Sequence, residues 1–140
     1  MKVELLVSVG LAILVVLSFV LILGLFVNSY LKWSEAAQRA DELLRSVLNS
    51  DQYDQLMRNG YLDIKSPSVP GCIYRVPRAQ GQVKVIEQGK LKKKLCLQPL
   101  ELVPEADIVV MHKLMIEADE KTYLQTANTF TPITSSSWDD

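Results

Sequence analysis

An uncharged apolar run from Leu5 to Val27 constrains this chain more than any other feature of its sequence. The run has 23 residues and contains neither a charged residue nor a proline. At a rise of 1.5 Å per residue, an α-helix of this length covers about 34 Å, which is enough to cross a hydrocarbon core of about 30 Å. The sequence therefore predicts a transmembrane helix near the N-terminus.

A secretory signal peptide is the competing interpretation of the same run. Its apolar region would have about 7–15 residues, and a small-x-small cleavage site would follow it. The run here is longer, and the residues at its end, FVNSYLKW, contain no such site. We therefore expect an uncleaved membrane anchor over residues 1–28.

The membrane is expected to end near residues 28–33. Tyr30 and Trp33 carry amphipathic rings of the kind found at headgroup level, and Lys32 can extend its ammonium to the phosphates. Orientation follows from lysines and arginines close to the span. The C-terminal side carries Lys32, Arg39 and Arg45 against Lys2 and the α-amino group on the N-terminal side, which favours a cytoplasmic C-terminal domain.

Residues 29–59 are predicted to form a helical stalk. Apolar residues recur there in steps of three and four, the period of one helix face. They are Trp33, Ala36, Ala37, Ala40, Leu43, Leu44, Val47 and Leu48. We expect this stripe to pack on the chain's own domain, with a second copy of the chain and the membrane surface as alternatives. A short second helix follows, with Ser50 as its expected N-cap and Asn59-Gly60 at its end.

Residues 60–128 are predicted to form a small α+β domain. Alternation in CIYRVP puts Cys72, Tyr74 and Val76 on one face of a strand. QVKVIEQGKLKKKLCLQP is typical of a hairpin that turns at Gln88-Gly89. In regular alternation, Leu91, Lys93, Leu95 and Leu97 share one face of its second strand, and Lys92, Lys94 and Cys96 share the other. A mostly antiparallel sheet of three or four strands is expected.

A C-terminal helix over 105–127 is expected to cover one face of this sheet. A small sheet is marginal alone and needs such a cover. The period of Ile108, Met111, Leu114, Met115 and Ala118 is helical. Residues 129–140 are polar and are predicted to form a tail.

The sequence shows no catalytic constellation, metal site or cofactor motif. Its candidate reactive residues are Cys72, Cys96 and His112, and a metal site normally needs three or four ligands. There is no glycine-rich phosphate loop and no nucleophile elbow. The cysteines could form a disulfide in an oxidising compartment, but buried free thiols are the favoured interpretation.

One lysine cluster is the best candidate for a binding surface. It comprises Lys84, Lys90, Lys92, Lys93 and Lys94. The cluster could contact anionic lipid headgroups or an acidic partner, or it could be a solvated strand face that discourages edge pairing. Nucleic acid is not expected as a ligand, because the net charge is −1 and these strands lack stacking aromatics.

These features together predict a single-pass, membrane-anchored accessory or scaffold protein without catalytic activity. Its partners would be the lipid bilayer, another membrane or membrane-associated protein and, as a further alternative, a second copy of the chain. Two other functions stay open at this stage. One is a membrane-tethered enzyme whose site is not visible in the sequence. The other is an anionic-lipid binder that uses the hairpin of residues 84–94, which carries the lysine cluster.

Overall fold

The computed structural model describes residues 1–131, apart from the side chain of Leu5. The chain divides into two compact units, Met1–Ala36 and a second unit that begins at Ala37. The division falls within helix α1 (Lys2–Val47). Each unit is described by itself below.

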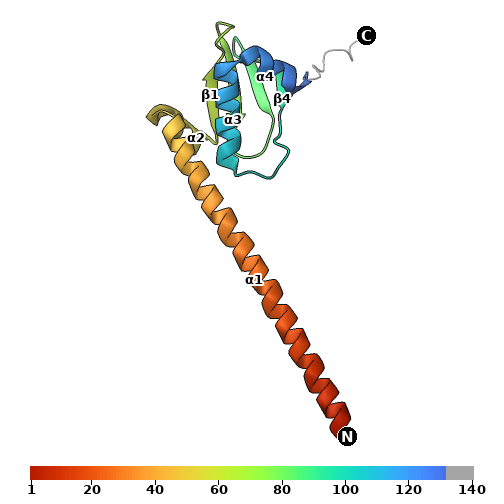
Figure 1. The fold of residues 1–140 in the computed structure, drawn as a ribbon. Helices are drawn as coiled ribbons and strands as arrows, with labels where there is room; N and C mark the ends of the chain where they lie inside the picture. The colour runs from red at the N-terminus through yellow and green to blue at the C-terminus, as the bar shows by residue number, and fades with distance from the viewer. Residues whose placement is uncertain (132–140) are drawn as a thin grey trace, which may run out of the picture. The chain divides into compact units, whose positions relative to one another are not determined.

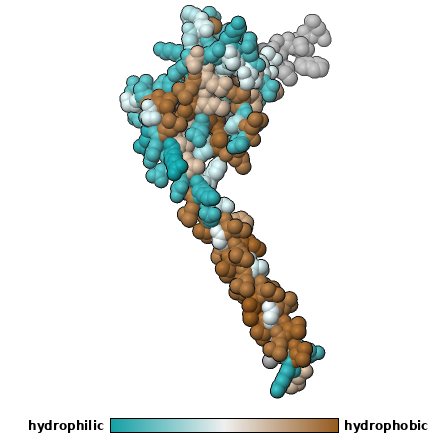
Figure 2. Space-filling view, in the orientation of Figure 1, coloured by the Kyte–Doolittle hydropathy of each residue, from teal (hydrophilic) through white to brown (hydrophobic). Residues whose placement is uncertain are grey.

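The first unit is helical (Figure 1), and most of its surface in view is hydrophobic (Figure 2). Leu14 is 65% exposed and Leu17 is 54% exposed, and the most apolar stretch buries no residue. Among the described residues, α1 is the one helix long and apolar enough to cross a membrane. The predicted apolar helix is therefore confirmed.

The second unit is built on a five-stranded antiparallel sheet in the order β1-β2-β3-β4-β5. The strands are β1 (Tyr61–Lys65), β2 (Cys72–Pro77), β3 (Val83–Glu87), β4 (Lys90–Cys96) and β5 (Asn128–Phe130). The helices are the end of α1, α2 (Ser50–Asn59), α3 (Glu105–Ala118) and α4 (Glu120–Thr126). The α+β fold predicted from the sequence is confirmed.

The core lies on one face of this sheet. Strand β2 alternates as expected, with Cys72, Tyr74 and Val76 buried. From the helices and from Leu48, which follows α1, the core receives Leu44, Leu48, Leu56, Val109, Val110, Ile116 and Tyr123. Helix α3 runs across this face in Figure 1. The stalk stripe thus packs partly on its own domain, because Leu44 and Leu48 are buried there while Leu43 is 47% exposed.

Helix α2 has a complete set of caps. The side chain of Asn49 accepts a hydrogen bond from the Gln52 amide at 2.8 Å, and the Gln52 side chain accepts one from the Asn49 amide at 3.3 Å. Gly60 ends the helix with φ +73°, a conformation that glycine adopts without strain. The expectation of Ser50 as N-cap is wrong by one residue, since Asn49 also offers a side-chain oxygen and makes the reciprocal bond.

Replacing Asn49 by alanine is expected to lower the free energy of unfolding by about 1 kcal/mol, because the Gln52 amide loses the side-chain oxygen that accepts its hydrogen bond. The measurement is thermal unfolding of the full chain in detergent micelles, followed by near-ultraviolet circular dichroism of the buried tyrosines. Ser50→Ala is the matched control and should change little. Equal losses in both variants would contradict the assignment of the cap.

The β3–β4 hairpin turns where the sequence predicts it. Gln88 and Gly89 both have positive φ, 50° and 77°, as in the turns that match the twist of two-residue hairpins. The expected alternation of β4 fails, however, at a bulge. Ile86 lies opposite Leu91 and Val85 opposite Lys93, so Lys92 is an extra residue. Leu91 therefore lies on the face opposite to that of Lys93, and is 40% exposed.

The single helix expected over 105–127 is two helices that meet at Asp119. The Asp119 carboxylate accepts hydrogen bonds from the Thr122 amide at 3.0 Å and from the Thr122 hydroxyl at 2.7 Å, which starts α4 as a new helix. The sheet also gains a fifth strand, β5, which includes Thr129 and Phe130 from the segment expected to be a polar tail. The rest of that tail, 132–140, lies outside the described residues.

Candidate functional site

Glu120 is a buried carboxylate at the start of α4 and is 6% exposed. It accepts hydrogen bonds from the Ser66 hydroxyl at 2.6 Å, the Ser68 amide at 3.0 Å and the Tyr74 hydroxyl at 2.5 Å. Burial acts to raise the pKa of Glu120, but these hydrogen bonds outweigh it and lower the pKa below its usual value. Glu120 thus ties α4 to β2 and to the loop after β1.

His112 forms a second buried polar contact. Its Nδ1 lies 2.9 Å from the Tyr123 hydroxyl, and the two rings meet edge to face. Burial lowers the pKa of His112 to about 4, so the ring is neutral at neutral pH. Burial also raises the pKa of Tyr123. His112 is thus a neutral ring, 2% exposed, that Tyr123 holds within the core.

Neither cysteine is paired. Cys72 is buried and Cys96 half-buried, and both thiols are free. Cys72 lies opposite Glu87, which lies opposite Lys90 at the start of β4, whereas Cys96 ends β4. At about 3.3 Å per residue the cysteines are about 15 Å or more apart, whereas a disulfide needs Cα atoms within about 7 Å. The disulfide considered from the sequence does not fit this register within one chain.

The predicted reactive residues do not form a joint site. His112 bonds to Tyr123 and to neither cysteine. Burial, with the charges of Glu87 and Glu120, raises the pKa of Cys72, which disfavours the nucleophilic thiolate. Within residues 1–131, no three histidine, cysteine or acidic side chains are grouped in a way that could hold a metal ion.

The face of the sheet opposite the core carries the charge. We call it the uncovered face, because the described helices pack on the other side. It includes Tyr61, Asp63 and Lys65 on β1, Ile73 and Arg75 on β2, Lys84 and Ile86 on β3, Leu91 and Lys94 on β4, and Phe130 on β5. On β1, β2 and β3 these residues alternate with buried neighbours.

Three cations lie directly opposite one another on this face. Arg75 pairs with Lys84 across β2 and β3, and Lys84 pairs with Lys94 across β3 and β4. Asp63 binds Arg75 through two bonds of 2.8 Å, and the guanidinium also lies 4.0 Å from the centre of the Tyr61 ring. That arrangement neutralises Arg75 but leaves Lys84 and Lys94 as a like-charge pair, which destabilises a sheet.

Lys84→Glu is expected to raise the free energy of unfolding by about 0.5 kcal/mol, because the new carboxylate would lie between Arg75 and Lys94. Thermal unfolding of the full chain in micelles measures the change. Lys65→Glu is the control: Lys65 lies opposite Ile73, so removing its charge relieves no repulsion in register. A loss of stability in Lys84→Glu would contradict the register of the three strands.

The structure separates the five lysines proposed as one binding cluster. Lys84 and Lys94 share the uncovered face. Lys93 lies opposite Val85 on the core side and lines a cavity of about 270 Å³ with Cys72 and Tyr74. Lys90 follows the turn and Lys92 occupies the bulge, and both are exposed.

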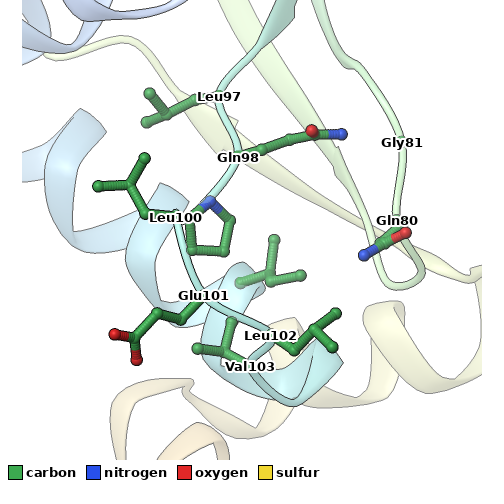
Figure 3. A pocket seen from close by; sticks show the side chains of 10 residues that line it. Gln80, Gly81, Leu97, Gln98, Leu100, Glu101, Leu102 and Val103 are labelled. Atoms are coloured by element: carbon green, nitrogen blue, oxygen red, sulfur yellow. The ribbon is translucent and has the colours of Figure 1, made fainter.

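A second pocket of about 190 Å³ lies between segment 97–103 and the loop that carries Gln80 and Gly81 (Figure 3). Its walls include Leu97 and Val103, and Glu101 is its one ionisable residue. Such a lining provides no acid–base pair and no nucleophile. The three residues predicted at the membrane interface, Tyr30, Lys32 and Trp33, belong to the first unit and are all exposed.

Sequence reasoning did not identify Glu120 or the pairing of Arg75 with Asp63. No local sequence pattern could indicate the contacts of Glu120, because its partners Ser66 and Tyr74 lie 54 and 46 residues away in the chain. For Arg75, the signal was an acid and a base at matching positions of two adjacent strands.

Comparison with known proteins adds no assignment: no protein-family model, curated protein or solved structure matches this chain.

Proposed function

We propose that this protein is a membrane-anchored accessory protein that presents a small, non-catalytic binding domain at a bilayer surface. The first unit would serve as the anchor. The second unit would supply the contact surface for a membrane or membrane-associated protein.

One observation carries this proposal, the exposure of the apolar helix. Side chains from Val3 to Val27 are apolar with few exceptions, and those that the structure describes are exposed. Exposing such a surface to water costs roughly 25 cal/mol for each Å² of apolar area, and lipid removes that cost. The second unit has its own core from Ala40 onward, so it does not need the first unit to fold around.

A binding role is supported by the contacts of the reactive side chains, which hydrogen-bond inside the core. His112, Tyr123, Tyr74 and Glu120 hydrogen-bond to one another or to nearby serines, which occupies their acid–base capacity inside the core. The function would then come from position. Tethering raises the effective concentration of the domain for any partner in the same membrane, which strengthens binding without new contacts.

The test is amine-reactive cross-linking in native membranes that contain the full chain. The proposal predicts a discrete adduct heavier than the chain. The adduct should persist when residues 5–27 are replaced by an unrelated apolar span, because the anchor only tethers. It should disappear when the span is broken by Leu14→Arg with Leu17→Arg. Absence of any adduct, or an equal yield from the broken-span variant, would overturn the proposal.

A further inference from the structure

The uncovered face carries a net positive charge that its own side chains do not neutralise. Asp63 offsets Arg75, which leaves Lys65, Lys84 and Lys94. None of these three lysines makes an ion pair within the described residues. The face therefore presents three ammonium groups spread over three strands, beside the exposed Lys92 of the bulge.

An apolar row runs beside these cations. Ile73 lies opposite Ile86, and Ile86 lies opposite Leu91, so the three side chains cross β2, β3 and β4 side by side. Ile73 and Ile86 are half-buried and Leu91 is 40% exposed. The bulge at Lys92 is the reason that Leu91 lies on this face. Cations beside apolar side chains match the boundary between lipid headgroups and acyl chains.

The free domain bears a cost for this arrangement, because Lys84 and Lys94 repel each other in direct register. Anionic phosphates between the two ammonium groups would turn that repulsion into attraction. Each lysine near an anionic membrane strengthens binding roughly fivefold.

We propose that the uncovered face of the sheet binds the headgroups of an anionic lipid bilayer through Lys65, Lys84 and Lys94, with Leu91 in the interface. Charge complementarity defines the ligand, and the apolar span of the first unit keeps a bilayer at high effective concentration. The inference rests on the anchor of the proposed function, but it does not depend on the existence of a protein partner.

The test uses the full chain in nanodiscs of phosphatidylcholine alone and of phosphatidylcholine mixed with phosphatidylglycerol. Each lysine is acetylated at low salt, and its rate is read by peptide mass spectrometry. Lys84 and Lys94 should react several-fold more slowly in the anionic discs. Lys121, which is exposed on α4, should react at the same rate in both. High salt should remove the difference, because it screens exposed charges.

Two variants of equal charge change sharpen the test. Lys84→Glu with Lys94→Glu should abolish the lipid-dependent protection of Lys65. Arg58→Glu with Lys121→Glu changes exposed cations on the helices and should retain the protection. The first variant replaces two exposed or half-buried side chains on the uncovered face and leaves the core intact, so it should fold.

The outcomes separate the inference from the proposed function. A chain that does not enter nanodiscs would overturn the anchor, and the inference with it. A chain that enters but shows equal labelling in both discs would overturn the lipid site alone. Protection by added polyglutamate, without protection by anionic discs, would assign the face to an acidic polypeptide and would also overturn the lipid site.

Discussion

Leu14→Arg combined with Leu17→Arg is expected to release the full chain from membranes. Both residues lie near the centre of the apolar run, where each arginine costs about 3 kcal/mol of insertion free energy. The two together amount to about 6 kcal/mol, a change of roughly four orders of magnitude in the membrane equilibrium. Flotation of membranes on a density gradient measures the result: the wild-type chain should float, and the variant should stay in the dense fractions.

The control places the same charges at the end of the span. Ser29→Arg with Ser34→Arg lies at or beyond the expected interface, where arginine can reach headgroups, so this variant should float like the wild type. In both variants the second unit should keep its near-ultraviolet circular dichroism, because its buried residues begin at Ala40. Flotation of the Leu14, Leu17 variant would contradict the assignment of the span.

The second unit is expected to lose about 3 kcal/mol of unfolding free energy as the pH falls from about 6.5 to about 4, because His112 is held neutral in the core. Its folded pKa is lowered, so the unfolded chain binds the extra proton. The stability is therefore fully present above the unfolded pKa of about 6.5 and is lost as the pH falls towards the folded value of about 4.

Denaturant unfolding of the full chain in micelles at several pH values measures this loss. His112→Asn removes the titrating group while keeping a polar atom near the Tyr123 hydroxyl, so its stability should be nearly flat in this window. Glu120 affects stability in a lower pH range. Because its pKa is lowered, its contribution to the free energy of unfolding is lost only below about pH 4.5. A pH dependence that persists unchanged in His112→Asn would contradict the account.

The features predicted correctly from the sequence depend on short-range periodicity. The apolar run, the alternation of β2 and the Gln88-Gly89 turn each follow from residues within one element. The exact paths of β4 and of the C-terminal helices do not follow from residues within one element. A bulge at Lys92 has no composition signal in a run of lysines, yet one extra residue puts Leu91 and Lys93 on opposite faces, whereas regular alternation puts both on the same face.

The break at Asp119 had a local signal that helical periodicity obscured. Asp119 followed by Thr122 is an N-cap pattern, but the apolar residues on both sides continue a helix-like spacing. Its consequence could not be predicted, since Glu120 reaches Ser66 and Tyr74 far along the chain. The lysine cluster was likewise visible as composition, whereas the pairing of Lys84 with Lys94 depends on strand register.

We propose above all that the apolar helix remains in the protein as a membrane anchor. Intact-mass measurement of the full chain, extracted from native membranes after an alkaline wash, tests this claim most directly. The washed membranes should retain a chain that still includes residues 1–28. A shorter chain that begins after the apolar run, recovered in the soluble fraction, would show that the run is a cleaved signal and would contradict the account.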